Sequence, residues 1–230
     1  MPARRFRLLV FDWDGTLMDS IGTIVSCTLK AFEGIEGVAP PPRDKIRESI
    51  GMGLAETMQK HFPEWGGRVA ERLVDNYRRL WRAEYKDRVA LFPGSFETIQ
   101  ELHGAGYLLG VATAKGRAGL ERELDATGLR RFFHGTRTVD EAPSKPAPGM
   151  LLGLYDELGI RPAETLMIGD TSFDLEMAAN ARCSSVGVLT GAQNRDHFAP
   201  HEPLAVLDSV RELPAWLDAA TPLRAAREDR

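Results

Sequence analysis

Two pairs of aspartates, each placed directly after a short apolar run, constrain this 230-residue chain more than any other feature. Asp12 and Asp14 follow Leu8–Phe11, and Asp170 and Asp174 follow a second such run. Runs of this kind are typical of buried parallel strands, and open α/β sheets bind their ligands at the carboxyl ends of those strands. Carboxylates gathered there repel one another unless a hard cation such as Mg²⁺ compensates their charge. The sequence therefore predicts an α/β fold with metal-assisted chemistry at the edge of its sheet.

Strand-like runs alternate with helical patterns from Pro93 onward, as βαβ units require. The predicted strands are residues 8–11, 107–112, 135–139, 165–168 and 185–188. Three helices are predicted from the spacing of their apolar side chains: Phe96, Ile99 and Leu102; Leu120, Leu124 and Leu129; and Met150, Leu151, Leu154 and Leu158. Gly104, Gly128 and Gly159 lie near their ends, where glycine is favoured. The alternation predicts a parallel sheet covered by helices.

Residues 19–88 contain no convincing strand and show helical spacing instead. Apolar residues recur at Ile46, Ile50, Leu54 and Met58, and again at Val69, Leu73, Tyr77, Leu80 and Trp81. Gly51 and Gly53 interrupt the first series, which indicates a turn that faces the site. We expect an α/β core formed by residues 1–18 and 89–220, a helical domain at 19–88 inserted after the first strand, and a frayed charged tail at 221–230.

Charge, hydropathy and cysteine content limit which binding partners and which cellular location are expected. A formal net charge of −4 and a pI near 5.8 give no electrostatic footprint for nucleic acid. No apolar run approaches the roughly 18 residues that a membrane-spanning helix needs, so no membrane partner is expected. Cys27 and Cys183 are far apart and share no motif, which favours a reduced, intracellular protein. We predict a cytoplasmic location.

The segment that begins at Asp12 can carry covalent chemistry. Residues two apart on a strand point the same way, so Asp12 and Asp14 can face one reacting centre. One carboxylate can act as a nucleophile, while its neighbour serves first as an acid and then as a base. Gly15 permits the tight turn that such an arrangement needs. The same residues also fit an ordinary Asp-Gly turn, and this segment alone leaves both interpretations open.

Two further strand ends carry Thr113 and Lys145. The Thr113 hydroxyl and the amides after it, beginning with Ala114, can hold phosphate oxygens, or Thr113 can simply cap a helix. Lys115 is either a phosphate-facing cation or a solvated surface charge, and we favour the surface. Two prolines fix the backbone beside Lys145, which can neutralise a nucleophile and a transferred phosphoryl group. Lys145 also fits a plain loop before a helix that a proline starts.

The four-residue spacing of Asp170 and Asp174 places them on neighbouring turns if a helix starts there. Such a pair can hold Mg²⁺ directly or through water. Alternatively, Asp170 caps the helix and Asp174 favours the positive end of its dipole, and the two roles are compatible. The order of these elements at four successive strand ends is what separates a catalytic site from a set of unrelated local features.

These four elements resemble the haloacid dehalogenase superfamily, specifically its phosphatase branch, in which a helical cap follows the first motif. The resemblance covers roughly residues 8–189. It implies a doubly wound parallel-sheet, Rossmann-like core with an inserted all-helical cap that closes over the substrate. It also implies a Mg²⁺-dependent phosphatase that hydrolyses a small phosphorylated metabolite through a phosphoaspartyl intermediate.

The resemblance assigns a role to each motif residue. It implies that Asp12 is the nucleophile, that Asp14 is the general acid and base, and that Thr113, Ala114 and Lys145 contact the phosphate. It further implies a Mg²⁺ ion held by Asp12, the Asp14 backbone carbonyl and Asp170, with Asp174 behind these ligands or joined through water.

Within the superfamily, the layout looks like that of phosphoglycolate phosphatase and its relatives. Phe92-Pro93-Gly94 at the exit of the insert fits this branch. Relatives often have an asparagine where this chain has Ala114, so a side-chain amide is missing there, and they often have Ala-Gly near Cys183. Arg47 in the insert can bind a substrate carboxylate, but we favour a solvent-exposed position for it.

Two other functions remain compatible with the same motifs. A hexose phosphomutase of the β-phosphoglucomutase type would protect its phosphoenzyme from water and return the phosphoryl group to a sugar. A non-catalytic phosphate-binding protein would keep the fold without turnover. A monomer or a homodimer is expected in each case.

Overall fold

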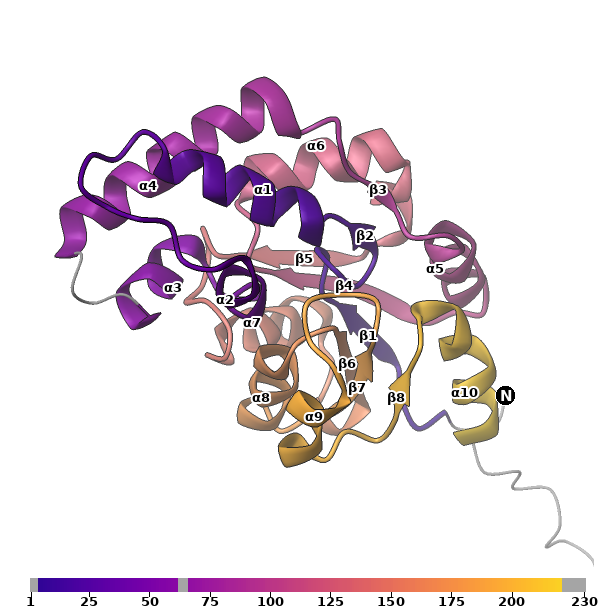
Figure 1. Ribbon diagram of the computed structural model, residues 1–230. Helices are drawn as coiled ribbons and strands as arrows, with labels where there is room; N and C mark the ends of the chain where they lie inside the picture. The colour runs from indigo at the N-terminus through magenta and orange to yellow at the C-terminus, as the bar shows by residue number, and fades with distance from the viewer. Residues whose placement is uncertain (1–3, 62–65, 221–230) are drawn as a thin grey trace, which may run out of the picture.

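The computed structural model describes residues 4–61 and 66–220, and the tail predicted at 221–230 lies outside them. Over the described residues, six strands form one sheet in the order β5-β4-β1-β6-β7-β8, and every neighbouring pair is parallel. The strands are β1 (Leu8–Phe11), β4 (Leu108–Thr113), β5 (Gly135–Thr138), β6 (Thr165–Gly169), β7 (Ser184–Val188) and β8 (Val206–Leu207). Because β1 lies inside the sheet (Figure 1), the residues after it reach the middle of the carboxyl-end edge.

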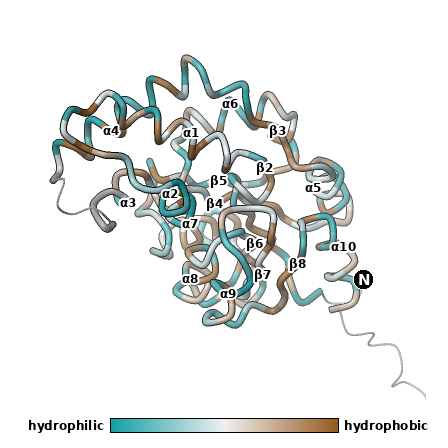
Figure 2. Tube along the Cα trace, in the orientation of Figure 1, coloured by the Kyte–Doolittle hydropathy of each residue, from teal (hydrophilic) through white to brown (hydrophobic). Residues whose placement is uncertain are grey.

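Helices cover both faces of this sheet, as a doubly wound fold requires. Leu9 and Phe11 belong to one buried cluster and Leu8 and Val10 to another, because alternate strand residues point to opposite faces. The first face is covered by α5 (Ser95–Gly104), α6 (Arg117–Thr127) and α10 (Leu213–Ala220), and the second by α7 (Gly149–Leu158) and α8 (Ser172–Asn180). Figure 2 shows hydrophobic stretches along the strands, between these layers. The predicted fold class is confirmed.

The predicted strands of the core are confirmed to within one residue at either end, and helices are present at all three predicted places. Leu129 is the exception, because it lies in the 3₁₀ turn η3 (Leu129–Phe132) after α6 has ended at the left-handed Gly128. β8 was not predicted, since two residues are too few to show an apolar period. The remaining short elements are η4 (Pro162–Glu164), α9 (Arg195–Phe198), η5 (Ala199–His201) and η6 (Val210–Glu212).

A helical insert follows the first strand, as predicted. It consists of α1 (Ile21–Phe32), α2 (Arg43–Glu48), α3 (Leu54–His61), α4 (Gly66–Leu80) and the π-helical turn η2 (Trp81–Tyr85). β2 (Met18–Asp19) and β3 (Ala90–Leu91), both unpredicted, pair antiparallel where the chain leaves and re-enters the core. Phe32 and Leu73 belong to a separate buried cluster of the insert. The insert therefore packs around its own core (Figure 1).

The regular spacing from Ile46 to Met58 belongs to two helices instead of one. α2 ends at Glu48 and α3 begins at Leu54, and a tight loop joins them. Gly51 adopts a φ of +114°, and a Cβ atom there would lie 2.8 Å from the Thr171 hydroxyl. The turn predicted at Gly51 and Gly53 is thus confirmed, and it packs against the carboxyl-end edge of the sheet.

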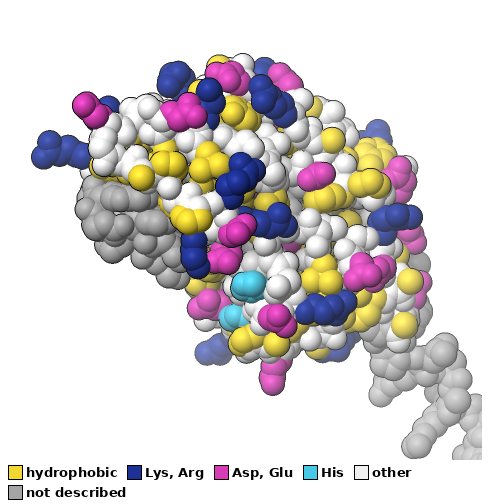
Figure 3. All heavy atoms as spheres, viewed as in Figure 1, with side chains coloured by type: hydrophobic (Ala, Val, Ile, Leu, Met, Phe, Trp, Pro, Cys, Tyr) yellow, Lys and Arg dark blue, Asp and Glu magenta, His cyan; other side chains and the backbone are white. Residues whose placement is uncertain are grey.

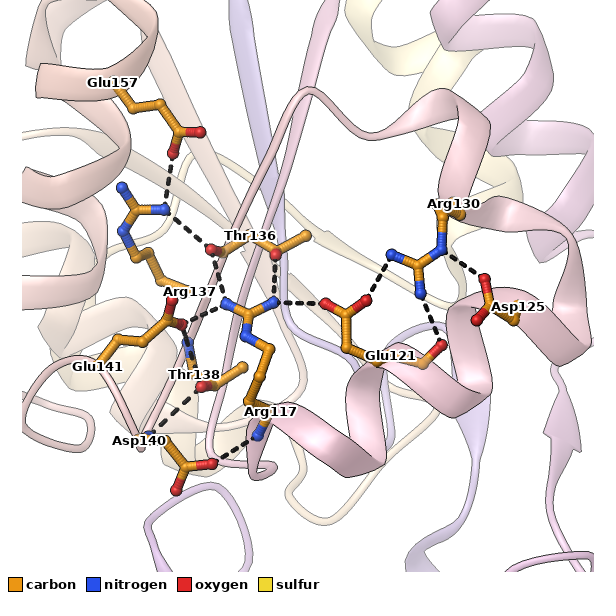
Figure 4. A network of polar contacts seen from close by, with 10 residues as sticks. All are labelled: Arg117, Glu121, Asp125, Arg130, Thr136, Arg137, Thr138, Asp140, Glu141 and Glu157. Carbon is orange, nitrogen blue, oxygen red and sulfur yellow. Dashed lines mark hydrogen bonds and ion pairs between the residues drawn. The ribbon is translucent and has the colours of Figure 1, made fainter.

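A polar network ties α6 to the edge strand β5 and the loop after it (Figure 4). The Arg117 guanidinium contacts Glu121, Thr136 and Glu141, while its backbone N–H donates to Asp140 at 2.7 Å. These contacts bring the N-terminus of α6 against the loop after β5, so they fix two borders of the site.

The visible surface mixes both signs of charge. Figure 3 shows Lys and Arg side chains interspersed with Asp and Glu side chains, over the insert and the core alike. In the described part of the chain, no helix combines the length and the apolar character needed to cross a membrane.

Candidate active site

Asp12 lies at the floor of the site, directly after β1. Its backbone N–H donates to the carbonyl of Ile168 at 2.9 Å, which continues the pairing of β1 with β6. The carboxylate is buried, and its Oδ1 lies 2.6 Å from the Lys145 ammonium. The strand register thus holds Asp12 beside the acidic loop that follows β6.

Lys145 joins two of the predicted motifs. It lies in the loop between β5 and α7, its side chain has no exposed surface, and its Nζ also lies 2.7 Å from Asp174 Oδ1. Burial alone would lower the pKa of Lys145, but the charges of Asp12 and Asp174 raise it above its ordinary value. The two carboxylates therefore favour the charged form of the buried Lys145 ammonium.

Asp170 follows β6 and accepts two hydrogen bonds, one from the Thr16 hydroxyl at 3.0 Å and one from the Ala192 amide at 2.8 Å. Two glycines make room for it. A Cβ at Gly15 would lie 2.4 Å from an Asp170 oxygen, and one at Gly191 would lie 1.8 Å from it. Larger residues at either position would displace the carboxylate.

Asp174 sits in the first turn of α8. One of its oxygens accepts from the backbone and hydroxyl of Thr171, at 3.1 and 2.8 Å, and the other faces Lys145. Thr171 is the N-cap of α8, so the alternative in which Asp170 caps this helix is wrong. Because Thr171 and Asp174 form the capping box, the Asp170 carboxylate is not needed to cap this helix.

The carboxylates of Asp12, Asp170 and Asp174 offer oxygen atoms that all lie within 4.8 Å of one another. Burial, followed by the charge of Asp174, raises the pKa of Asp12 to about 7 despite the neighbouring Lys145. Burial and the charges of Asp12 and Asp174 raise the pKa of Asp170 as well. One ammonium thus faces three buried carboxylates, and an all-oxygen donor set with excess negative charge fits a hard divalent cation.

Asp14 is held on the opposite side of the floor. Its Oδ1 accepts from the Ser20 hydroxyl at 2.7 Å, and its Oδ2 lies 3.2 Å from the Lys115 ammonium. The prediction that Lys115 is a solvated surface charge is wrong, because only 9% of its side chain is exposed. The ammonium also lies 5.1 Å from the ring centroid of Trp81, on the insert.

Glu123 and Trp13 complete this side of the site, and the sequence reasoning missed both. Glu123 is buried, with one oxygen 3.1 Å from the Lys115 ammonium and the other accepting from the Trp13 indole at 2.7 Å. The sequence did contain a signal for Glu123, because its spacing places it on the same helix face as Leu120 and Leu124. A carboxylate on an otherwise buried helix face needs a polar partner.

Thr113 ends β4 and is buried, and its hydroxyl accepts from the Lys115 amide at 3.2 Å. The N-cap of α6 is Gly116, so the alternative in which Thr113 caps the helix is wrong. Thr113 and Ala114 line the same cavity as Asp12 and Asp14. The structure thus brings the predicted residues of two strand ends to one space.

That cavity has a volume of about 640 Å³ and lies between the core and the insert. The core supplies its floor and one wall. The insert supplies the loop between α2 and α3 and one face of α4. A volume in this range accommodates a small organic ligand.

Arg47 does not line the cavity. Its guanidinium donates to the carbonyls of Gly191 and Ala192, at 2.5 and 3.2 Å, so it ties the insert to the core loop beside Asp170. The Gly53 amide makes a second such tie, to the Ser144 hydroxyl at 2.7 Å. Arg47 is exposed as a residue, as favoured from the sequence, but its guanidinium is engaged.

Comparison with known proteins agrees with this geometry. A family profile described as "Haloacid dehalogenase-like hydrolase" matches residues 9–188. The chain is 34% identical to "Probable phosphatase IndB" of Dickeya dadantii, over 90% of this chain and 91% of that protein. It is 28% identical to a phosphoglycolate phosphatase of Vibrio parahaemolyticus, over 93% and 96% of the two chains. It is also 32% identical to pyrophosphatase PpaX of Halalkalibacterium halodurans, over 89% and 94%.

The fold recurs among solved structures. A hydrolase of the haloacid dehalogenase-like family from Streptococcus pneumoniae superimposes with a TM-score of 0.80. The alignment covers 92% of this chain and 98% of that one at 22% identity. This match extends over the core and the insert together.

Proposed function

The chain belongs to the haloacid dehalogenase-like hydrolases, and we propose that it hydrolyses a small phosphomonoester through a phosphoaspartyl intermediate. The observation that carries this proposal is that Asp12 and Asp14 line one cavity, while Asp12 also contacts the buried Lys145 ammonium and belongs to a cluster of three buried carboxylates. Phosphoglycolate is the first candidate substrate.

In the first step, an Asp12 oxygen attacks phosphorus and the bond from phosphorus to the ester oxygen breaks. Asp14 gives a proton to the departing oxygen, so an alcohol leaves instead of an alkoxide. Lys145, which contacts Asp12 directly, offsets negative charge that gathers during the transfer. The Thr113 hydroxyl and the Ala114 amide hold phosphoryl oxygens at the end of β4.

In the second step, water attacks the phosphorus of the aspartyl-phosphate. Asp14, now deprotonated, takes a proton from that water, and the bond between phosphorus and the Asp12 oxygen breaks. Inorganic phosphate leaves and Asp12 is restored. The contacts of Asp14 with Ser20 and Lys115 keep the carboxylate in place through both steps.

We further propose that Mg²⁺ is the ion of this site. The oxygens of Asp12 and Asp170 and the Asp14 backbone carbonyl would hold it, with Asp174 joined through water because one of its oxygens already faces Lys145. The ion would offset the charge of the phosphate and the carboxylates during the transfer.

We propose that the helical insert, residues 19–88, acts as a cap on the core formed by 1–18 and 89–220. Its loop at Gly51–Gly53 contacts Thr171 and Ser144, and its Trp81 lies over Lys115. These contacts support a cap that lies over the cavity and shields an aspartyl-phosphate from untimely water.

Phosphoglycolate is supported by the relative of Vibrio parahaemolyticus that bears the name phosphoglycolate phosphatase, and by the match of the motif layout to that branch. Both cysteines are free, which agrees with the proposed cytoplasmic location. The assay described next distinguishes hydrolysis from the phosphomutase reaction and from non-catalytic phosphate binding.

The test is phosphate release from phosphoglycolate, sugar phosphates, nucleoside monophosphates and pyridoxal phosphate, with Mg²⁺ and with a chelator. We expect metal-dependent release, with one ester preferred by about a hundredfold in kcat/KM, equivalent to about 2.7 kcal/mol. Isomerised sugar phosphate that depends on a bisphosphate would establish the mutase instead. Absence of release and of isomerisation would leave the non-catalytic alternative.

A further inference from the structure

One face of the α4 helix and the following π turn lines the cavity with two kinds of side chain. Val74, Tyr77 and Trp81 provide apolar and aromatic surface, and Arg78 and Arg82 lie among them. The rings of Tyr77 and Trp81 stack with their centroids 5.6 Å apart. A π turn in a helix is frequent at functional sites, and here it begins at Trp81.

The arginines of the cavity have few of the ion pairs that arginines usually form in the described part of the chain. Arg78 and Arg82 form no ion pair with any residue among 4–61 and 66–220. Arg122 enters from the core side on α6, and its buried Nη2 has no hydrogen-bond partner in that part of the chain. Its one ion pair in the described residues is a long one, 3.8 Å from Nη2 to Glu123, a carboxylate that also contacts Lys115 and Trp13 at shorter distances.

The carboxylates that line the cavity do not balance these guanidinium groups, because most are engaged elsewhere. Asp12 faces Lys145, Asp14 faces Lys115 and Ser20, and Asp140 accepts the Arg117 amide. Glu56 on α3 is the remaining acidic residue of the lining, and it is exposed. Within residues 4–61 and 66–220, two guanidinium groups without an ion pair, and a third whose one ion pair is the long contact with Glu123, therefore border the cavity against one carboxylate without an ion pair or a hydrogen bond, that of Glu56.

These arginines lie on the side where the leaving group departs. Arg122 is next to Glu123, Glu123 holds Lys115, and Lys115 holds Asp14. Trp81 packs over the same Lys115 ammonium, which places the arginine-bearing helix face beside Asp14. Since Asp14 protonates the departing oxygen in the proposed reaction, whatever is attached to that oxygen extends toward this wall.

We propose that Arg78, Arg82 and Arg122 form a subsite for a second anionic group, so that the substrates are phosphate esters or anhydrides whose leaving group carries a carboxylate or a phosphate. The guanidinium fork suits both groups, because it donates two parallel hydrogen bonds. Tyr77 and Trp81 supply the surface for the body between the two anions. This inference rests on the proposed phosphatase function and specifies its substrate class.

The experiment compares substrates that differ only in the second anion. Phosphoglycolate is paired with ethyl phosphate, and 4-carboxyphenyl phosphate with phenyl phosphate, while pyrophosphate distinguishes a phosphate from a carboxylate as the second group. The measured quantity is the ratio of kcat/KM within each pair. We expect the unaltered protein to favour the anionic member by tenfold or more, since hydrogen bonds to charged groups are the strong ones.

Arg78→Gln, Arg82→Gln and Arg122→Gln should each lower that ratio about tenfold. Arg79→Gln is the matched control, because Arg79 is exposed on the same helix and does not line the cavity. It should leave the ratio unchanged. Arg78→Lys keeps the charge but loses the fork, so its ratio should fall between those of the unaltered protein and Arg78→Gln.

Each outcome has one meaning. Equal hydrolysis of charged and uncharged members, or a ratio that the three Gln variants leave intact, overturns the subsite while the phosphatase function stands. Absence of phosphate release from every substrate overturns the phosphatase function itself. If a Gln variant fails to fold by circular dichroism, the Lys variant at the same position decides, and an unchanged ratio there counts against the subsite.

Discussion

The floor of the site and the wall that the insert provides differ in how deeply their charged side chains are buried and how firmly they are held. On the floor, Asp12, Lys145 and Asp170 are 3% exposed or less, and each has a fixed partner. On the wall, Arg78 and Arg82 are exposed and form no ion pair in the described residues. A buried set whose members contact one another can hold reacting atoms in one geometry, while exposed cations that form no ion pair remain available to a ligand. On the proposed function, we expect reaction chemistry from the core, and substrate selection from the insert together with Arg122 of α6.

Asp12→Asn tests the floor with the largest expected effect. An amide cannot act as the nucleophile, so kcat should fall by at least about a thousandfold. The measurement is steady-state phosphate release. Asp19→Asn is the control, because Asp19 is exposed on β2, and it should retain activity. Retained turnover in Asp12→Asn would contradict the role given to the floor.

Lys145→Met removes the cation that faces two buried carboxylates. Loss of one partner from a buried ionic group costs about 3–5 kcal/mol, so the free energy of unfolding should fall by that amount. Denaturant unfolding followed by circular dichroism measures it. Arg78→Gln on the wall should leave this free energy nearly unchanged. Equal losses in the two variants would erase the contrast between floor and wall.

The change in Tm on adding Mg²⁺, measured at two pH values, tests the charge of the carboxylates on the floor. In chelator, Asp12 keeps its proton up to a pKa of about 7 in the folded state, against 3.8 as its ordinary value. The folded state then binds more protons than the unfolded state, so the contribution of Asp12 to stability falls as pH rises from about 4 to about 7. Because the metal binds the deprotonated carboxylates, Mg²⁺ should raise Tm more at pH 8 than at pH 6. A gain in Tm that is larger at pH 6 would contradict the assignment.

Gly51→Ala tests the contact between the two regions, with the smallest expected effect. Gly51 has a φ of +114°, and its Cβ would lie 2.8 Å from the Thr171 hydroxyl. Gly37→Ala is a matched control, since Gly37 also has a positive φ, +76°, but a Cβ there would meet nothing within 4 Å. Both variants should lose about 1 kcal/mol from backbone strain, and only Gly51→Ala should also raise KM. The same KM in both would show that the contact does not affect substrate binding.

The residues of the floor could be predicted from the sequence because they follow the carboxyl ends of strands. Asp12 and Asp170 follow recognisable apolar runs, and parallel strands bring their carboxyl ends to one edge whatever the details of packing. The convergence of Asp12, Lys145 and Asp174 agrees with that rule. The two-residue strands β2, β3 and β8 escaped prediction because they are too short to show a period.

The wall could not be predicted, because it depends on which way helix faces point after packing. Lys115 was expected at the surface, yet Trp81 from the insert covers it, and no local pattern relates two residues so far apart in the chain. Arg78 and Arg79 are adjacent and chemically identical in the sequence, but only the first lines the cavity. The sequence allows Arg47 to be a substrate ligand or an exposed residue, but in the structure its guanidinium binds two core carbonyls, a contact that neither alternative contains.

The central claim is that Asp12 carries the phosphoryl group, and rapid acid quench during turnover tests it most directly. The protein would be mixed with its preferred substrate and Mg²⁺, quenched within milliseconds, digested and examined by mass spectrometry. The account predicts a phosphoryl group on the peptide that contains Asp12, at the Asp12 side chain, and its absence from the Asp12→Asn variant. Steady phosphate release with the phosphoryl group on another residue, or with an unmodified Asp12 peptide at every quench time, would contradict it.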